Sequence, residues 1–451
     1  MSTENSLLDW GYWIPLPAYA LVFLLVVFPM IPALLPVKAF LLAVILAAVV
    51  VATLATGHSR LHPTVALWTF SLSSVGFLFI LEGFFAGAPG AENTVGVYVI
   101  WPIIYVLMIA GVRNERILTG LFRTLVVSTI FIGIYSIVYL LIQTNVVPPS
   151  RYFDLISFDW DPQAFGLSEG YLSMQYPGLN SLPFLIPFSL AALVTCLRRM
   201  EGTVPLLRVG LWLAVLLGLT SVALSGRRAL FLVTLFAPAL TLLFLSFQPI
   251  AQRRSTGKAL VRVTAGVVLA VVVLIFCLNA SYGIGLTGIT DRLSVGFDFS
   301  PTTADQGANE RRKQFHVLFT EWKENPILGA GHGSPAYGSI RSGKSPWSYE
   351  LYYMALLYQT GLLGVAAYAA GLFWIYWMGV RVIRSGGYMS ALMVAALVGM
   401  SSILIANATN PYLDGFDAMW AIFFPLALIN FWLMRRAGPK RLAVHALALQ
   451  A

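Results

Sequence analysis

The chain has 451 residues, of which 58% are hydrophobic and only 10% are charged. A soluble domain carries charge on roughly a quarter of its residues, so this composition excludes a water-exposed globular fold and indicates long segments that face lipid. The net charge of +9 does not indicate nucleic acid as a partner, because the basic residues gather in short loops between apolar runs, as membrane topology requires.

Apolar runs long enough to cross a bilayer recur along the whole chain. Each can cross a hydrocarbon core of about 30 Å at about 1.5 Å per helical residue. The first two runs are nearly continuous, and we expect a tight hairpin at Leu35-Pro36-Val37-Lys38 to divide them. The sequence therefore predicts an all-α polytopic membrane protein with about twelve transmembrane helices in a single transmembrane domain, 1–451. The expected spans are 18–37, 38–57, 64–86, 94–112, 117–142, 179–197, 206–224, 229–247, 262–284, 362–380, 389–408 and 417–434.

Lysine and arginine are unevenly shared between the two sets of loops. With the N-terminus inside, the short outer loops hold only Lys38 and the pair Arg227-Arg228, and most other positive charges are cytoplasmic. Both termini are therefore expected in the cytoplasm. The cytoplasmic basic residues include Arg198, Arg199, Arg253, Arg254, Arg435 and Arg436.

Two longer segments, 143–178 and 285–361, are expected to be insertions that face outward into the periplasm. The first is rich in aromatic and acidic residues, and the second mixes glycine, serine and charged residues. The second is predicted to contain one helix near 308–324 and another near 348–359. Neither segment resembles an independent domain.

The first candidate motif is Leu224-Ser225-Gly226-Arg227-Arg228-Ala229-Leu230, between the seventh and eighth spans. Two adjacent arginines on a short outer loop oppose the positive-inside trend and must overcome a desolvation cost. The planar donor fork of arginine suits phosphate oxygens, so Arg227 and Arg228 are candidate diphosphate ligands. The alternative is a pair that reaches to lipid headgroups.

A second basic motif, Asn309-Glu310-Arg311-Arg312-Lys313, begins an amphipathic stretch that ends at Asn325-Pro326 and the glycines that follow. A basic cluster at a helix start opposes the helix dipole unless an anion binds there. Arg311 and Arg312 are therefore candidate anion ligands, and a solvated basic face is the alternative.

The third motif places Glu350 in a tyrosine-rich setting just before a predicted span. Apolar surroundings tend to raise the pKa of a carboxyl group, which suits a general base near neutral pH. The hydroxyls of Tyr349 and Tyr353 are candidate ligands for a sugar acceptor. The alternative role for Glu350 is an ion pair with Lys344 or a nearby arginine.

Other polar groups indicate less. The turn 408–417 carries Asp414 and Asp417 and is expected to face the same compartment as the arginines. His332 lies between glycines, which permit close approach of a ligand. Cys196 and Cys277 lie in apolar runs, and the sequence contains no metal-ligand spacing and no nucleotide-binding motif, so no metal is expected.

Taken in order, these motifs resemble the O-antigen ligase and polymerase superfamily of bacterial envelope glycan assembly. The resemblance rests on the 224–230 motif, on Arg311 with Asn325-Pro326-Ile327-Leu328-Gly329-Ala330-Gly331, and on Tyr353 with Thr360-Gly361-Leu362-Leu363-Gly364. It covers the C-terminal half, whereas the N-terminal half is similar only in hydropathy.

The resemblance implies a metal-independent glycosyltransferase of the GT-C-like class, without a cofactor, in the bacterial inner membrane and with a periplasmic active site. Its donor would be a glycan linked to undecaprenyl diphosphate. The arginines that match are Arg227, Arg228, Arg311 and Arg312, which would hold the diphosphate leaving group.

The position at which ligases of this superfamily carry a histidine is occupied here by Glu350. Glutamate in a Ser-x-Glu-x-x-Tyr setting looks more like the polymerase branch (Wzy-type), and the turn Asn410-Pro411-Tyr412-Leu413 is similar to that branch as well. The favoured hypothesis is a polymerase of O-antigen or exopolysaccharide repeat units, with Glu350 as general base and a chain-length regulator protein as a candidate partner. An O-antigen ligase that uses His332 and a lipid A-core acceptor is the alternative, and a lipid-linked oligosaccharide flippase is a third hypothesis.

Overall fold

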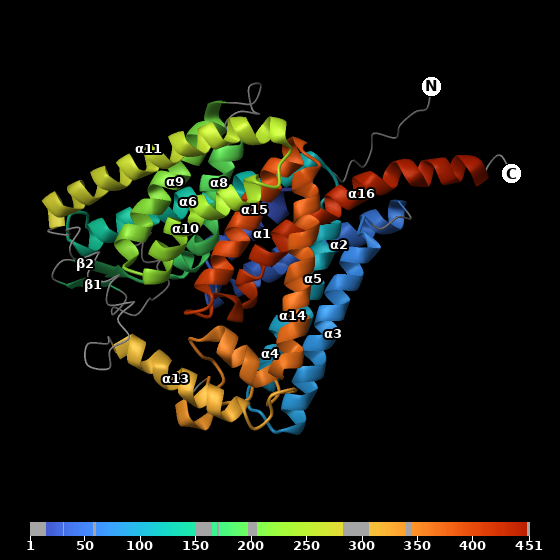
Figure 1. The fold of residues 1–451 in the computed structure, drawn as a ribbon, viewed down its shortest axis with the longest axis horizontal. Coiled ribbons are helices and arrows are strands. Elements are labelled where there is room, and N and C mark those ends of the chain that lie inside the picture. Colours follow the sequence, from blue (N-terminus) through green and yellow to red (C-terminus); the bar gives the residue numbers. More distant parts are fainter. Residues whose placement is uncertain are drawn as a thin grey trace.

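The computed structural model describes residues 15–29, 31–56, 60–148, 165–168, 171–196, 205–282, 306–339 and 345–448, and these form a helical bundle with one short hairpin (Figure 1). The long helices are α1 (Pro15–Val27), α2 (Leu35–Thr56), α3 (Pro63–Phe85), α5 (Trp101–Ala110), α6 (Glu115–Gln143), α8 (Leu182–Cys196), α9 (Pro205–Ser225), α10 (Arg228–Leu245), α11 (Ile250–Tyr282), α13 (Gln306–Trp322), α14 (Tyr352–Arg384), α15 (Gly387–Ala406) and α16 (Trp420–Ala448). Shorter elements are the helices η2 (Pro32–Leu34), α4 (Ala91–Val95), η3 (Gly96–Ile100), η5 (Pro177–Ser181), η6 (Tyr337–Ser339), η7 (Tyr412–Asp414) and η8 (Phe416–Ala418), and the antiparallel strands β1 (Phe165–Ser168) and β2 (Tyr171–Met174).

Among the described residues, 11 helical segments are long and apolar enough to cross a membrane. The chain is therefore a polytopic α-helical membrane protein, as the hydropathy predicts. The expected twelfth span corresponds to α1, which has 13 residues and a length of about 20 Å, short of the roughly 30 Å of a hydrocarbon core.

The expected hairpin at 35–38 is wrong. The chain turns earlier, after Val27, and Leu35-Pro36-Val37-Lys38 forms the first turn of α2. Proline is well tolerated in the first turn of a helix, where its missing N–H has no intrahelical partner to lose. Pro36 therefore begins the second span rather than ending the first.

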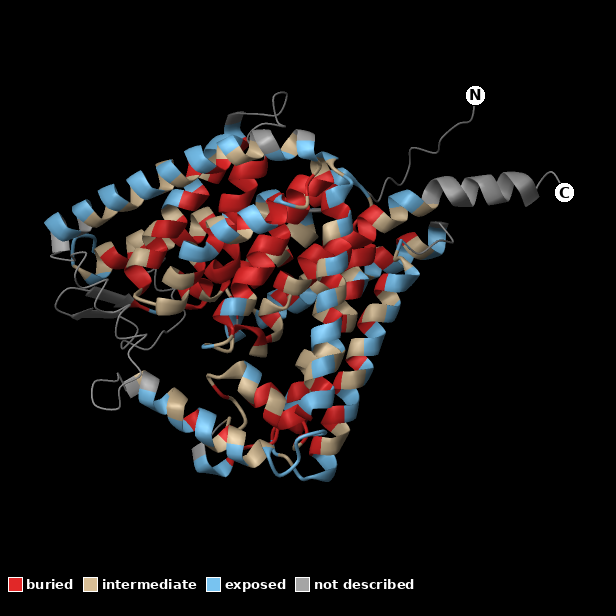
Figure 2. Ribbon diagram, viewed as in Figure 1, coloured by how far each residue is buried: buried red, intermediate tan, exposed pale blue. Residues whose placement is uncertain are grey.

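Helices α8 and α15 form the centre of the bundle and are almost entirely buried (Figure 2). Small residues along α15 allow close packing: Gly399 faces the ring of Phe184 on α8 at a distance that leaves no space for a side chain. Close approach through small residues is the usual basis of helix association in membranes, where apolar burial gives little net drive.

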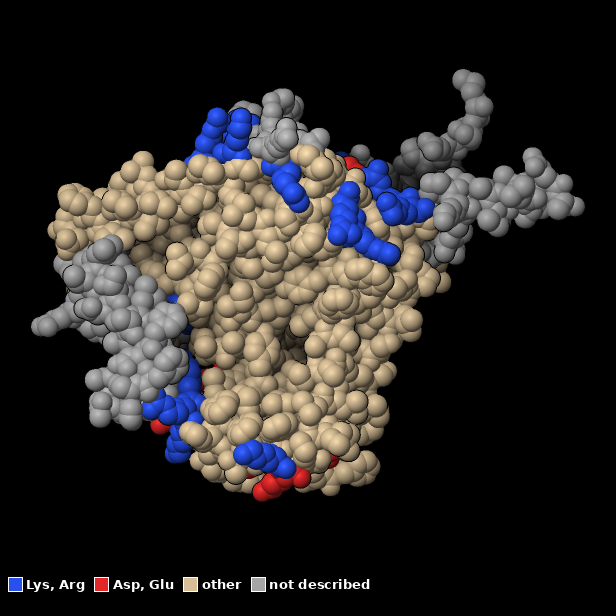
Figure 3. Space-filling view, viewed as in Figure 1, with Lys and Arg blue, Asp and Glu red and all other residues tan. Residues whose placement is uncertain are grey.

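On the face drawn in Figure 3, lysine and arginine side chains gather along one end of the bundle, here called the basic end. Arg60 donates to the backbone carbonyl of Arg113 at 3.2 Å, and Asn430 of α16 donates to the carbonyl of Arg60 at 3.0 Å. Glu115 at the start of α6 forms an ion pair with Arg435. These contacts bring together loops that the sequence assigns to the cytoplasm.

Loops at the opposite end, here called the site end, are joined by a buried ion pair between Lys38 and Asp417. Lys38 also donates to the carbonyl of Phe28 at 2.8 Å, and Ser181 donates to the carbonyl of Val26. Lys38 was expected in an outer loop, but it lies in the first turn of α2 and is buried, because Asp417 compensates its charge there.

Helices α3 and α14 run side by side away from the rest of the bundle and carry α13 near their far ends (Figure 1). The helix expected near 308–324 is observed as α13. The helix expected near 348–359 begins at Tyr352 and is continuous with the next span, with a kink at Gly361 where φ is +59°. The hairpin of β1 and β2 lies in the first of the two expected insertions.

Candidate functional site

The loop between α9 and α10 holds Arg227 in a defined position. Gly226 adopts a φ of +60°, and the Ser225 hydroxyl accepts a hydrogen bond from the backbone N–H of Arg227 at 3.2 Å. The half-buried guanidinium group donates from Nη1 to Oδ1 of Asn180, 2.7 Å away, in η5. The Ser-Gly-Arg turn therefore holds the Arg227 side chain against η5 at the site end of the bundle. Its neighbour Arg228 is the first residue of α10 and is half-buried as well.

Helix α13 presents Arg311 to Glu350. Nε of Arg311 lies 2.8 Å from Oε2 of Glu350, and the two side chains are 30% and 17% exposed. The backbone N–H of Glu350 donates to Oε1 of the buried Gln314, one turn further along α13, at 3.1 Å. Glu350 is thus fixed to α13 through its side chain and its backbone, and both partners of the ion pair can still be reached by a ligand. Arg312, the next residue, is half-buried.

Tyr412, in η7, connects the two arginine segments. Burial raises the pKa of its hydroxyl, and the guanidinium groups of Arg227 and Arg311 partly offset that rise. Since this effect requires proximity, both arginines lie near one hydroxyl group. We call Arg227, Arg311, Glu350 and Tyr412 the arginine–glutamate cluster.

The turn that carries Tyr412 is also bound to the segment that carries Glu350. Ser348 donates to Oδ2 of Asp414 at 3.1 Å. Burial raises the pKa of Asp414, and the bond from Ser348 partly offsets this. This bond places the turn beside the segment that carries Glu350. Asn180 was not expected as a partner of Arg227, since an asparagine before a span carries no distinctive pattern.

The chain matches no family model, no curated protein and no solved structure. In the part of the chain that the structure describes, no group of three or more histidine, cysteine, aspartate or glutamate side chains is placed to hold a metal ion.

The two tyrosines expected to bind an acceptor have different surroundings. Tyr349 is buried in a small second core with Leu318 and Tyr358, and its hydroxyl accepts a hydrogen bond from the backbone N–H of Ala336. Burial raises the pKa of Tyr349 to about 12. This position is structural, so we do not carry Tyr349 forward as an acceptor ligand. Tyr353 is 40% exposed, donates to the carbonyl of Leu404 at 2.6 Å and lines an apolar cavity of about 130 Å³.

His332, the alternative base, is fully buried within the chain. Its Nδ1 lies 3.3 Å from Oε1 of Gln359, and its Nε2 lies 3.1 Å from the hydroxyl of Tyr368. The ring stacks on Tyr98 with centroids 3.9 Å apart. Burial lowers the pKa of His332 to about 4. Both ring nitrogens are used by the chain itself, an arrangement that serves packing rather than proton transfer to a substrate.

The glycines around His332 were interpreted as room for a ligand, but the chain itself occupies that room. Gly329, Gly331 and Gly333 all have φ near +83°, a conformation that favours glycine. A Cβ atom on Gly331 would lie 2.2 Å from the backbone nitrogen of Gly83 in α3, and one on Gly333 would lie 2.2 Å from that of Ala91 in α4. The glycine-rich segment therefore packs directly against the end of α3 and the start of α4.

The arginine–glutamate cluster has the chemistry of an anion site beside a base. The guanidinium groups of Arg227 and Arg311, from separate segments, both act electrostatically on the hydroxyl group of Tyr412, and both side chains are half-buried. Guanidinium groups form strong charge-assisted bonds to phosphate oxygens. One carboxylate lies directly beside one of them and can accept a proton once that arginine has another anion to bind. The structure thus brings Arg227, Arg311 and Glu350 together, and leaves His332 and Tyr349 in the packed interior.

Proposed function

We propose that the chain is a GT-C-like membrane glycosyltransferase that polymerises undecaprenyl-diphosphate-linked repeat units of O-antigen or exopolysaccharide. The observation that carries the proposal is the contact of Arg311 with Glu350, together with the electrostatic effect of both Arg227 and Arg311 on the hydroxyl group of Tyr412. The site end would face the periplasm of the bacterial inner membrane, and both termini would be cytoplasmic, as the distribution of positive charge predicts.

In this reaction a sugar hydroxyl of the incoming lipid-linked unit attacks the anomeric carbon of the growing chain. The bond from that carbon to the diphosphate oxygen breaks, and the undecaprenyl diphosphate leaves with the electron pair. Arg227 and Arg311 would stabilise the charge that develops on the diphosphate. Arg228 and Arg312, the adjacent residues, would extend the same positive surface.

Glu350 would take the proton of the attacking hydroxyl. In the structure its carboxylate is engaged by Arg311, so a base function requires an exchange of partners. A diphosphate offers Arg311 two oxygens in the geometry of its donor fork and would draw it from Glu350. The carboxylate would then be released only when donor is present, which couples the base to an occupied site.

An O-antigen ligase remains the alternative hypothesis, with lipid A-core as acceptor. It would need a base other than His332, because both nitrogens of that ring are engaged in the interior. A flippase, the third hypothesis, requires polar groups along the centre of the bundle, whereas the cluster lies at its end. A chain-length regulator protein remains a proposed partner.

The experiment that separates these functions is a gel of surface polysaccharide from a strain without the gene. Loss of a polymerase leaves lipid A-core that carries at most one repeat unit, and a plasmid copy with Arg311→Ala should fail to restore the ladder. Bare core with long polymer retained on its carrier would support the ligase instead. An unchanged ladder would contradict both.

A further inference from the structure

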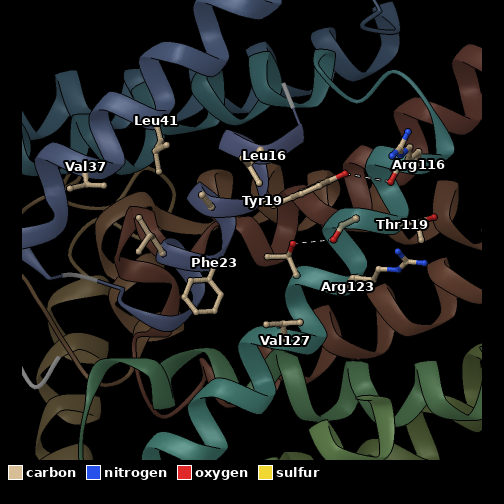
Figure 4. Close-up of a pocket in the computed structure, with 13 residues that line it drawn as sticks. Leu16, Tyr19, Phe23, Val37, Leu41, Arg116, Thr119, Arg123 and Val127 are labelled. Atoms are coloured by element: carbon tan, nitrogen blue, oxygen red, sulfur yellow. Dashed lines mark hydrogen bonds between the residues drawn. The ribbon is translucent and has the colours of Figure 1, made fainter. Parts of the chain in front are cut away.

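A groove of about 1000 Å³ lies between α1, α2 and α6, on the bundle's exterior and apart from the arginine–glutamate cluster (Figure 4). Its walls are mostly aliphatic and aromatic, and three wall residues, Leu16, Val37 and Val127, are 75%, 46% and 53% exposed. In a membrane protein such exposed apolar walls face lipid chains. The groove is therefore open to the bilayer.

Two arginines of α6 lie at the edge of this apolar groove. Arg116 and Arg123 both line it and both are exposed on the chain's own surface. Seven residues correspond to two helical turns, so the two side chains share one face of α6, about 10 Å apart along its axis. Figure 4 shows both on α6, with Thr119 between them in sequence and Tyr19 of α1 reaching toward the backbone of Arg116.

The position of Arg123 is what requires an explanation. It lies about two turns inside the span that begins at Glu115, roughly 12 Å from the start of the helix. A charged side chain on the lipid-facing surface of a transmembrane helix is stabilised where an anion meets it, and such residues usually have a functional partner. Arg116 lies in the first turn of the same helix, nearer to the basic end.

We infer that this groove binds one anionic phospholipid from the leaflet at the basic end, with its phosphate between Arg116 and Arg123 and its acyl chains along the walls formed by α1 and α2. Basic pockets between transmembrane helices recognise lipid headgroups in this way. A soluble anion would gain nothing from Phe23, Leu41 and Val127, which make up the apolar wall. The lipid would hold the short helix α1 against α6, independently of the proposed transferase reaction.

The test uses the full-length chain, purified in detergent, stripped of lipid and titrated with phosphatidylglycerol while native mass spectrometry counts bound lipid. The double variant Arg116→Gln/Arg123→Gln should bind the first phosphatidylglycerol about thirtyfold more weakly, at about fivefold for each arginine. The matched control is Arg381→Gln/Arg384→Gln, two arginines in the last turn of α14 at the same end of the bundle. The control should bind as the wild type does.

Three results would overturn the inference. The first is equal affinity of the wild type and the groove variant for phosphatidylglycerol. The second is equal affinity of the wild type for phosphatidylglycerol and phosphatidylcholine, which would mean that the groove recognises chains and not charge. The third is binding that appears only after removal of residues 1–14, whose carboxylates Glu4 and Asp9 would then be the occupant.

Discussion

At the scale of single residues, the central pair is Arg311 and Glu350, whose charged atoms lie 2.8 Å apart. If Glu350 is the general base, Glu350→Gln should keep donor binding and lose transfer by roughly 10²–10⁴ in rate. The matched control is Glu310→Gln, an exposed acid beside Arg311 on the same helix, which should keep its activity. Transfer and binding are measured separately on the purified chain.

A purely structural ion pair gives a different outcome for the same variant. Glu350→Gln would then retain most of its transfer rate and would lose mainly thermal stability, because the Arg311 side chain would lack its anionic partner. That result would remove Glu350 from the mechanism while leaving the arginines in it.

His332 makes a prediction about pH. Its pKa is about 4 in the folded chain and about 6.5 when exposed, so the unfolded state binds the proton first as pH falls. The stability contributed by the neutral ring is complete above pH 6.5 and is lost between pH 6.5 and 4, by at most about 3 kcal/mol. As pH falls from 6.5 to 4, the thermal unfolding temperature of the wild type should therefore decrease more steeply than that of His332→Gln. Parallel curves for the two proteins would contradict the buried, neutral histidine.

The sequence could predict candidate site residues where their type is rare in the surrounding chain. Adjacent arginines in a short loop and a lone carboxylate among tyrosines are rare in a chain with 10% charged residues. The structure places Glu350 beside Arg311, and both Arg227 and Arg311 act on the hydroxyl group of Tyr412. The placement of His332 and Tyr349 could not be predicted, since burial depends on how distant helix ends pack. The local sequence carries no information on that packing.

At the scale of elements, the glycine-rich segment and the kink in α14 form one interlocked unit. The backbone N–H groups of Ala330 and Gly331 donate to the carbonyls of Tyr358 and Gln359, and those of Leu362 and Leu363 donate to Pro326 and Ile327, all at 2.9–3.1 Å. These bonds satisfy the groups that the kink removes from the helical ladder. The sequence motifs 325–331 and 360–364 thus form one structural unit.

Gly361 cannot be substituted without disrupting this unit. Its φ is +59°, and a Cβ atom would lie 2.2 Å from the carbonyl oxygen of Ile327. Gly361→Ala should therefore lower the free energy of unfolding by about 3 kcal/mol or more. Gly257→Ala, in α11 with open space around it, is the control and should stabilise by about 0.5–1 kcal/mol. Detergent-based thermal unfolding measures both, and equal behaviour of the two variants would refute the interlock.

The positions of the helices could be predicted from hydropathy where polar loops separate the apolar runs. The exception is the N-terminal pair, where one apolar run contains both α1 and the start of α2. Hydropathy cannot divide such a run, and proline gives two opposite signals, because it ends one helix and begins another equally well.

At the scale of the whole molecule, the contacts sort the loops into two ends of the bundle. Lys258→Cys probes the basic end and Glu324→Cys the site end, in a background without Cys196 and Cys277. We expect a membrane-impermeant maleimide added to intact cells, after mild opening of the outer membrane, to label Glu324→Cys and not Lys258→Cys. The opposite pattern would invert the topology and place the cluster in the cytoplasm.

The central claim is that Arg227 and Arg311 hold a diphosphate leaving group during chain extension, and reconstitution tests it most directly. The purified chain in vesicles, supplied with undecaprenyl-diphosphate-linked repeat units, should produce lipid-linked chains of more than one repeat. Arg227→Ala and Arg311→Ala should each reduce the extension rate by about 10²–10³, with poor rescue by lysine, whereas Arg381→Ala should extend normally. Extension by both alanine variants at the wild-type rate, or no extension by the wild type, would contradict the account.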